Sequence, residues 1–291
     1  MADEIYVVVP VFNRRSLTER FLHCMREQRF RNFATIIVDD GSTDGTAELV
    51  AEQFKEVQVL RGDGNLWWTG AINLGIRHAM ASASQDDAIL VLNDDLEIDS
   101  DYLETLHKSW RSNPRTLIGS VAVDIRNPEV IVDGGRIVNW WTAKMTMLNL
   151  QRKLYEFPKN HYADVSLLTG WGTLIPIQVF REIGLYDDKH FQQCGDTELP
   201  VRAKKAGYRL VVSYDAIVKV HTDASDGVNV SNRYSLRDVK RYFFDVKSNF
   251  RLKYRLFFDL KTATNPFAFV SFFLFDLIRI TGHFFLRLRL R

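Results

Sequence analysis

The N-terminal part of the sequence alternates short apolar runs of strand length with longer segments of helical spacing. The apolar runs are IYVVVP at residues 5–10, ATIIVDD at 34–40, VQVLRG at 57–62 and DAILVLNDD at 87–95. In the segment after the first run, apolar residues recur every three or four positions at Leu17, Phe21, Leu22 and Met25, which predicts an amphipathic helix. Strands that are apolar throughout and separated by helices are typical of a mostly parallel sheet covered on both faces. The alternation therefore predicts an α/β fold.

Two of these runs end in a pair of adjacent carboxylates. Asp39 and Asp40 end the second run, and Asp94 and Asp95 end the fourth. Neighbouring carboxylates repel one another, so each pair needs water or a partner. Ligands of open α/β sheets bind at the carboxyl ends of the strands, which makes both pairs candidates for a ligand site. The simpler alternative is that they are polar turns that begin the next helix.

The charge distribution divides the chain into an acidic body and a basic tail. The net charge of the 291 residues is +2. Residues 228–291 hold 13 Lys and Arg against 4 Asp, and the rest of the chain holds 25 basic against 32 acidic residues. The tail also carries 12 of the 20 Phe, all from Phe243 onward. Basic and aromatic residues together favour an anionic membrane surface as a partner over nucleic acid.

The tail ends in a long apolar segment. Phe267 to Leu286 is long enough to cross a bilayer. However, one face of a helix in this segment would carry four polar residues, which we call the polar stripe: Asp276, Arg279, His283 and Arg287. A polar stripe on an otherwise apolar helix favours a helix that lies in the membrane interface. The alternatives are docking onto the body of the protein or onto a second copy.

The termini and the cysteines bear on the compartment. The chain begins MADEIYVVVP, which is acidic and has no basic segment before an apolar run, so we expect no signal peptide. Cys24 and Cys194 are too few for a disulfide framework and are typical of a reducing compartment. With the basic tail, these features predict a cytoplasmic protein, peripheral on the inner face of the cell membrane.

Five blocks of the sequence carry a resemblance to a known family. They are VVVPVFNRRS, IIVDDGSTDGT, GDGNLWWTGAINLGI, LVLNDDLEI and CGDTELPVRAKKAGYRLV. In order and spacing they resemble the inverting nucleotide-sugar glycosyltransferases of family 2, whose fold is called GT-A. The resemblance covers about residues 5–225. The block GNLWWTGAINLGI is similar to a bacterial subgroup associated with rhamnosyl transfer to surface polysaccharides.

The resemblance implies a fold and its division. We expect a GT-A type, Rossmann-like, mostly parallel sheet flanked by helices over residues 1–227. The nucleotide-binding half would comprise about residues 1–98 and the acceptor-binding half about 99–227. Residues 228–291 would form a basic, aromatic, helical extension that associates with the membrane.

The resemblance also implies a nucleotide site. The residues that would wrap the nucleoside at the end of the first run are Pro10, Phe12 and Asn13. Asp40 matches the position that accepts N3–H of the pyrimidine base, while Asp39 would support the turn. Asp94 matches the position that faces the ribose or the sugar. Guanidinium groups suit phosphate oxygens, and the candidates for contact with the diphosphate are Arg14, Arg15 and Arg61.

A divalent metal is implied next to the nucleotide. Asp95 matches the metal-binding acid of the family, and the metal would be Mn²⁺ or Mg²⁺. Such hard cations take carboxylate oxygens and share them with substrate phosphates. His221 follows the strand-like run IVKV at residues 217–220. Enzymes of this fold often supply a further metal ligand at this position. The alternative for His221 is an ordinary histidine at a strand end.

The acceptor side of the site is implied by a block near residue 196. Asp196 matches the general base, which needs only one carboxylate to take a proton from the acceptor hydroxyl; Gly195 stands where many members have another acid. Asp196 would also serve as a helix N-cap, and Glu198 would orient the acceptor or favour the helix dipole. Trp171 is expected at the floor of the acceptor site and Trp68, in a glycine-flanked loop, near the sugar or base. Aromatic residues of this kind are also common in packing.

These features predict an enzyme that transfers a sugar with inversion. The donor would be a nucleoside-diphosphate sugar, such as dTDP-rhamnose or a UDP-hexose. The acceptor would be a glycan, lipid-linked, in cell-surface polysaccharide synthesis. One alternative is a nucleotidyltransferase, but its phosphate loop needs glycine and VPVFNRRSLT has none. The other alternative is a non-catalytic carbohydrate- or membrane-binding protein that keeps the fold.

Overall fold

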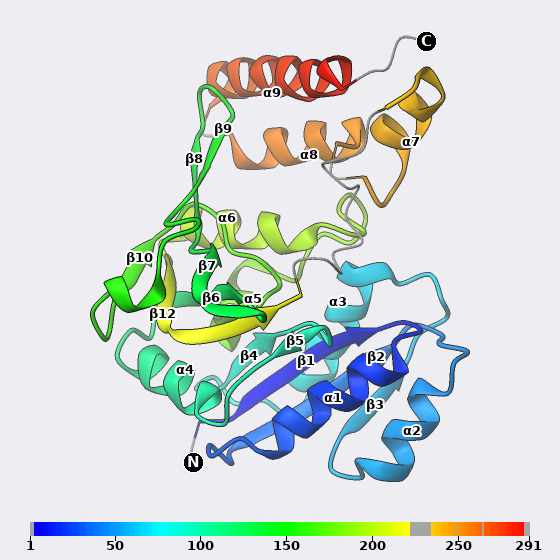
Figure 1. The fold of residues 1–291 in the computed structure, drawn as a ribbon, viewed down its shortest axis with the longest axis vertical. Coiled ribbons are helices and arrows are strands. Elements are labelled where there is room, and N and C mark those ends of the chain that lie inside the picture. The colour runs from blue at the N-terminus through cyan, green and yellow to red at the C-terminus, as the bar shows by residue number, and fades with distance from the viewer. Residues whose placement is uncertain (1–2, 222–233, 249, 264, 288–291) are drawn as a thin grey trace.

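The computed structural model of the chain describes residues 3–221, 234–248, 250–263 and 265–287 (Figure 1). The strands are β1 (Ile5–Val11), β2 (Phe33–Asp39), β3 (Gln58–Arg61), β4 (Ala88–Val91), β5 (Leu96–Glu97), β6 (Thr116–Asp124), β7 (Asn127–Asp133), β8 (Arg136–Asn139), β9 (Lys144–Met147), β10 (Tyr162–Asp164), β11 (Thr173–Pro176) and β12 (Arg209–Val220). The α-helices are α1 (Arg15–Arg26), α2 (Thr46–Gln53), α3 (Trp67–Met80), α4 (Tyr102–Arg111), α5 (Ile177–Ile183), α6 (Glu198–Lys205), α7 (Val239–Phe244), α8 (Leu252–Thr262) and α9 (Pro266–Leu286). Short 3₁₀ helices are η1 (Leu154–Glu156), η2 (Gly195–Thr197) and η3 (Leu236–Asp238).

The large sheet is mostly parallel. Its strand order is β10-β12-β6-β11-β4-β1-β2-β3, with β5 paired to β12 and β7 paired to β6. Strand β1 is parallel to β2 and β4, β2 is parallel to β3, and β12 is parallel to β6. Strand β11 runs antiparallel between β4 and β6. The predicted sheet is therefore confirmed, and the strands β1 to β4 end at one common edge.

Helices cover both faces of this sheet. Alternate residues of β1, such as Val7 and Val9, pack with apolar residues of α1, α2 and α4. The residues between them, Tyr6 and Val8, pack with α3, α5 and α6. Because successive side chains of a strand point to opposite faces, a strand covered on both sides must be apolar throughout. This explains the continuous apolar runs and confirms the α/β class.

Helix α3 begins earlier than the sequence indicated. The sequence predicted a glycine-flanked loop for Trp68, but Trp67 and Trp68 lie in the first turn of this helix. The reason is non-local: the backbone N–H of Trp67 donates to a carboxylate oxygen of Asp40 at 3.0 Å. An acid from the neighbouring strand end thus satisfies a donor at the start of the helix, where N–H groups lack partners within the helix.

The tail lies on the body of the protein. Helices α8 and α9 stand above α6 and beside the β8–β9 hairpin at the top of Figure 1. An apolar cluster joins them to the body: Val138, Ala143, Leu167, Phe191, Val201, Phe258 and Phe272. The side chain of Lys205 donates to the carbonyl oxygens of Lys261 and Ala263 at 2.8 and 2.9 Å. The helical extension is confirmed, while the predicted boundary at residue 227 lies outside the described residues.

The polar stripe of α9 is turned inward. Asp276 is buried and forms ion pairs with Arg279 and, at 3.6 Å, with Arg255 of α8. The Nδ1 of His283 lies 3.0 Å from the hydroxyl of the buried Tyr242. The sequence favoured a helix in the membrane interface and left docking onto the body as an alternative; here the polar side of α9, apart from the exposed Arg279, packs on the body. Helix α9 is long and apolar enough, by length and composition alone, to cross a membrane, with a mean hydropathy of 1.6.

Two phenylalanines of α9 test how firmly the tail is docked. Phe272 is 5% exposed and stacks on Trp140 at a centroid distance of 5.6 Å, whereas Phe267 is 82% exposed. Phe272→Ala should lower the free energy of unfolding by about 3 to 5 kcal/mol, because it removes a buried ring and leaves a cavity. Phe267→Ala, the matched control, should change it by no more than about 0.5 kcal/mol.

Urea denaturation measures these free energies, and hydrogen exchange of the α8 and α9 amides shows whether the tail opens separately. Equal effects of the two substitutions would contradict the docked arrangement.

Candidate active site

Two loops at the carboxyl edge are tied together by hydrogen bonds. The backbone N–H of Asn13 donates to Ser42 Oγ, and Asn13 Oδ1 accepts from the N–H of Thr43, both at 2.8 Å. The N–H of Arg15 donates to Asp44 Oδ2 at 3.0 Å. The expected nucleotide residues therefore lie together at one braced junction: Pro10 near the end of β1, Phe12 and Asn13 in the loop after it, and Arg15 at the start of α1. Phe12 is 54% exposed there, which leaves a ring face available for stacking.

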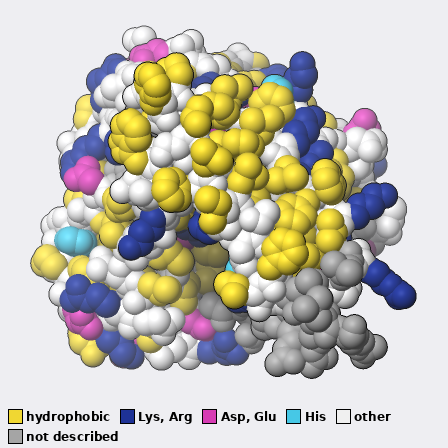
Figure 2. Space-filling view, turned by 90° about the horizontal axis from the view of Figure 1, so that it is seen from above, with side chains coloured by type: hydrophobic (Ala, Val, Ile, Leu, Met, Phe, Trp, Pro, Cys, Tyr) yellow, Lys and Arg dark blue, Asp and Glu magenta, His cyan; other side chains and the backbone are white. Residues whose placement is uncertain are grey.

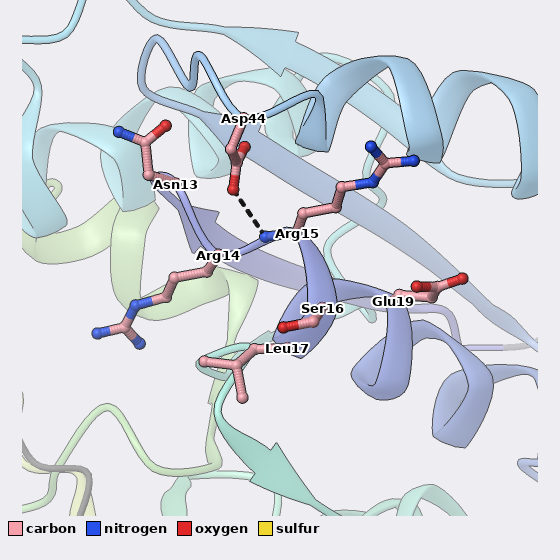
Figure 3. A pocket seen from close by; sticks show the side chains of 7 residues that line it. All are labelled: Asn13, Arg14, Arg15, Ser16, Leu17, Glu19 and Asp44. Carbon is pink, nitrogen blue, oxygen red and sulfur yellow. Dashed lines mark hydrogen bonds between the residues drawn. The ribbon is translucent and has the colours of Figure 1, made fainter.

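An open hollow of about 440 Å³ lies beside this loop (Figure 3). Its lining residues are Asn13, Arg14, Arg15, Ser16, Leu17, Glu19 and Asp44. The guanidinium groups of Arg14 and Arg15 point in opposite directions from the start of α1, as Figure 3 shows. Neither Asp40, Asp95 nor Asp196 lines this hollow, so it is at most the outer part of a nucleotide site.

The acid pair after β2 organises two turns. Asp39 Oδ1 accepts from the N–H of Ser42 at 2.9 Å, which is the turn-supporting role expected for it. The buried Asp40 accepts from the N–H of Gly64 at 2.9 Å and of Trp67 at 3.0 Å. Asp40 thereby fixes the loop between β3 and α3. Each carboxylate oxygen has two lone pairs, so these bonds leave acceptor capacity for a base.

The acid pair after β4 binds an arginine. Arg14 Nη1 lies 2.9 Å from Asp95 Oδ2 and 3.4 Å from Asp94 Oδ1. The buried Asp94 also accepts from Thr18 Oγ1 at 2.9 Å. Burial raises the pKa of Asp94 to about 6, although Arg14 and Thr18 both favour its ionised form. A single guanidinium thus offsets part of the negative charge of the pair.

The residues near Asp95 fit a metal that is shared with a substrate. Asp95 Oδ1 is buried and has no hydrogen-bond partner among the described residues. Strand β12 pairs antiparallel with β5 through Val220 and Leu96, which brings the following His221 to the end of the strands where Asp95 lies. His221 Nε2 is 3.9 Å from Glu97 Oε1.

Within the described ranges, no group of three or more His, Cys, Asp or Glu could hold a metal ion. Mg²⁺ and similar ions often take only one or two carboxylates and complete their shell with waters and phosphates. The free oxygen of Asp95 fits a cation bound in this way.

Asp196 lies in η2, immediately before α6. Its Oδ2 accepts from the backbone N–H of Gly170 at 3.0 Å, and the residue remains partly exposed. Loss of solvation raises the pKa of Asp196, while the Gly170 N–H lowers it. A carboxylate with a raised pKa is a stronger proton acceptor than an ordinary surface acid. Its charge and position suit a general base.

Trp68 connects the separate acids. Its indole Nε1 donates to Asn93 Oδ1 at 3.0 Å, next to Asp94. A methyl group on Gly170 would lie 2.6 Å from Trp68 Cζ2, so the ring packs directly on the backbone that binds Asp196. The preceding Trp67 binds Asp40. The first turn of α3 therefore joins the regions of the three predicted acids into one edge.

Trp171 and Glu198 differ in what they offer an acceptor. Trp171 is partly exposed and packs against the core, and the next residue, Gly172, binds the Val91 carbonyl at 3.1 Å. Glu198 is 0% exposed, and its carboxylate pairs with Arg202 at 2.6 Å. Arg202 also donates to the carbonyl of Leu185 at 2.6 Å. The structure does not place Glu198 where an acceptor could touch it, and we correct its interpretation to an anchor of α6.

Sequence reasoning missed two features of the site. Arg14 was considered only for phosphate contact and not as the partner of Asp94 and Asp95. Asn93 was passed over, although it accepts the Trp68 indole N–H. Asn93 could have been found because it directly precedes the acid pair at the end of β4. The pairing of Arg14 with Asp95 spans 81 positions, and no local pattern shows it.

The fold is that of the GT-A glycosyltransferases. The chain matches the structure of Staphylococcus aureus TarS 1-349 in complex with UDP with a TM-score of 0.60 and 15% identity, covering 99% of this chain and 76% of that one. It matches the mannosyltransferase PcManGT from Pyrobaculum calidifontis, in complex with GDP-Man and Mn²⁺, with a TM-score of 0.59 and 15% identity, over 96% and 71% of the two chains. These likenesses show the fold.

Residues 6–174 match the family described as Glycosyl transferase family 2. The chain therefore belongs to glycosyl transferase family 2 and is a sugar-transferring enzyme. It is also 26% identical over 267 residues, 84% of each chain, to the N-acetylglucosaminyl-diphospho-decaprenol L-rhamnosyltransferase of Mycobacterium tuberculosis.

The anchor role of Glu198 can be separated from an acceptor role. Glu198→Ala should lower the free energy of unfolding by about 3 to 5 kcal/mol, because it leaves the Arg202 guanidinium without its buried partner. Glu104→Ala removes an exposed pair with Lys108 and should cost less than about 1 kcal/mol. Thermal denaturation measures both. A stable Glu198→Ala protein with a raised KM for the acceptor would restore the acceptor role.

Proposed function

We propose that this enzyme transfers a sugar, with inversion, from a nucleoside-diphosphate sugar to a lipid-linked glycan in cell-surface polysaccharide synthesis. The observation that carries the proposal is the junction at Trp68. This residue binds Asn93, beside the acid pair, and packs on Gly170, which binds Asp196. It thereby connects the segment of Asp196 to that of Asp95, whose Oδ1 has no hydrogen-bond partner among the described residues. Leaving-group stabilisation and proton removal are the two tasks of such a transfer, and one acid is available for each. The rhamnosyltransferase relative favours dTDP-rhamnose as a donor, with a UDP-hexose as the other candidate.

The donor would be bound by residues 1–98. Asp40 would accept N3–H of a pyrimidine base, and Phe12 would offer its exposed ring to the base. Pro10 and Asn13 would shape the same loop around the nucleoside. Asp94 would face the ribose or the sugar.

A divalent cation fits Asp95, with His221 as a further ligand. When bound, Mn²⁺ or Mg²⁺ supplies positive charge that stabilises the departing diphosphate. Arg14 and Arg15 would add charge on the same side of the donor. Of these, Arg14 already pairs with Asp95 through Oδ2, so its charge would oppose a cation that binds the other oxygen of the same carboxylate.

Residues 99–227 would bind the acceptor and remove its proton. Asp196 takes the proton of the acceptor hydroxyl as that oxygen attacks the anomeric carbon. The new bond forms from the acceptor oxygen to the anomeric carbon, and the bond from that carbon to the diphosphate oxygen breaks with its electron pair. A single displacement inverts the configuration and needs no covalent intermediate. Trp171 and Trp68 would line the sugar and acceptor subsites.

A lipid-linked acceptor requires the enzyme to work at a membrane. We propose that it acts in the cytoplasm, peripherally on the inner face of the cell membrane, and that residues 228–291 make the contact. The basic composition of this region favours an anionic leaflet.

Donor turnover separates this proposal from a non-catalytic carbohydrate-binding protein. Asp196→Asn should lower transfer at least about a hundredfold, because the acceptor proton has no base, while the affinity for the nucleoside diphosphate stays unchanged. Asp86→Asn, an exposed acid before β4 at the opposite edge of the sheet, should keep full activity. Release of nucleoside diphosphate with Mn²⁺ present and the anomeric configuration of the product, determined by NMR, are the measurements. Retained configuration, or no turnover with any nucleotide sugar, would contradict the proposal.

Arg14 should hinder the metal when no donor is present. Two unit charges about 4 Å apart interact by about 4 kcal/mol at the effective dielectric constant of a protein surface, so its guanidinium should repel an incoming cation. Arg14→Gln should therefore bind Mn²⁺ at least about tenfold more tightly in the absence of donor, as measured by calorimetry.

Arg15→Gln is the matched control, because the Arg15 guanidinium points away from Arg14 (Figure 3). Unchanged or weaker Mn²⁺ binding by Arg14→Gln would show that Asp95 is not the metal site.

A further inference from the structure

The docked tail leaves one long apolar face uncovered. The residues of this outer face of α9 are Phe267, Val270, Leu274, Phe275, Ile278, Phe285 and Leu286. Leu256 and Leu260 of α8 are also exposed. Figure 2 looks down on this part of the molecule and shows hydrophobic side chains gathered across it. Contiguous apolar patches beyond a few hundred Å² are rare on soluble monomers and mark interaction sites.

The β8–β9 hairpin extends this face. The hydroxyl of Ser271 in α9 donates to the carbonyl oxygen of Trp141 at 2.8 Å, which fixes the hairpin turn beside the helix. Trp140 packs inward on Phe272, whereas Trp141 is 54% exposed. The adjacent tryptophans thus divide their roles, one holding the tail and one lying beside its apolar face.

The charged residues around this face are almost all basic. In the described parts of residues 234–287, the exposed charged residues are Arg237, Lys240, Arg241, Lys247, Lys253 and Arg279, with Asp245 as the single acid. Asp259 and Asp276 are buried. Figure 2 shows Lys and Arg side chains around the hydrophobic area. A positive border around an apolar, aromatic face complements the anionic headgroups and acyl chains of a lipid surface.

A second copy of the chain fits this face less well. A two-fold symmetric dimer brings the same patch of both subunits together, so the basic borders would face each other and repel. An anionic bilayer offers the opposite charge.

We propose that the outer face of α9 and Trp141 together bind the interface of an anionic bilayer, with α9 lying in the membrane plane. A crossing helix would have to leave α8, exposing the Asp276 carboxylate and the Arg279 guanidinium to hydrocarbon, which costs several kcal/mol. The in-plane orientation keeps their ion pairs and the apolar cluster around Phe272 intact. The inference extends the proposed function, since it gives the membrane contact a defined surface and orientation.

This surface is rigidly connected to the segment of the general base. The hydroxyl of Tyr254 in α8 lies 3.0 Å from Thr197 Oγ1, and Thr197 follows Asp196. Arg251 Nη1 donates to Gln192 Oε1 at 3.4 Å. One layer, α8, therefore separates the bound bilayer from η2. An acceptor held by a lipid would reach Asp196 from a fixed height above the membrane.

Vesicle flotation with the full chain tests the proposal. The wild type should float with vesicles of phosphatidylglycerol and phosphatidylcholine in equal parts, less so with pure phosphatidylcholine, and high salt should weaken binding. Leu274→Gln combined with Ile278→Gln should lower vesicle affinity at least tenfold, and Trp141→Ser should lower it by a smaller factor. Tyr155→Ser is the control for Trp141→Ser, since Tyr155 is an even more exposed aromatic residue, 72% against 54%, but lies in η1, which packs on β7.

Several outcomes would overturn the proposal. Flotation that the α9 and Trp141 substitutions leave unchanged would exclude this surface. A dimer that the same substitutions dissolve, without vesicle binding by the wild type, would assign the face to a second copy. Resistance of the cell-membrane-bound protein to alkaline carbonate extraction would mean that α9 crosses the bilayer. Vesicle binding without any sugar transfer would contradict the proposed function but still support the proposed membrane-binding surface.

Discussion

The contact between the Trp68 indole and the Gly170 backbone is the interaction on which the site depends. It joins α3, in the proposed donor half, to the loop before β11, in the proposed acceptor half. The same indole binds Asn93 after β4, and its neighbour Trp67 binds Asp40 after β2. One helical turn thus contacts the segments of three acids that are far apart in sequence: it binds Asp40 directly, reaches the segment of Asp95 through Asn93, and packs on the Gly170 backbone that binds Asp196. A side chain at position 170 would separate them, which explains the glycine there.

The acids of the site are held by different partners, and this divides their roles. Asp40 is held by backbone N–H groups and Asp196 by the Gly170 N–H, so neither needs a side chain that could move away. Asp94 and Asp95 are held by Arg14, a flexible side chain. A rigid hold suits groups that must keep their position during the reaction. A flexible guanidinium suits carboxylates that would exchange partners on binding the proposed donor and metal.

Local patterns in the sequence predicted what local forces determine. The apolar runs gave the sheet, and the acidic strand ends gave the edge where Asp40 and Asp95 lie, because strand periodicity and topology fix both. Other features depend on partners that the local pattern does not show. The start of α3 depends on Asp40, from another part of the chain, and the inward side of α9 depends on Arg255 of α8. The burial of Glu198 depends on Arg202, one turn further along the same helix. A sequence pattern identifies a polar residue but not the partner that buries it.

The tail shows why a polar stripe does not by itself orient a helix. Burial and the nearby Asp276 raise the pKa of Asp259 to about 8, so Asp259 carries its proton at neutral pH. Asp276 is then left as the partner of Arg255 and Arg279. The interior of the helix pair can thus hold acids without a large uncompensated charge, and α9 gains by packing its polar side inward. Its apolar side is left for a surface that excludes water, and the exposed charges of the described tail are, apart from Asp245, the basic ones that an anionic surface attracts.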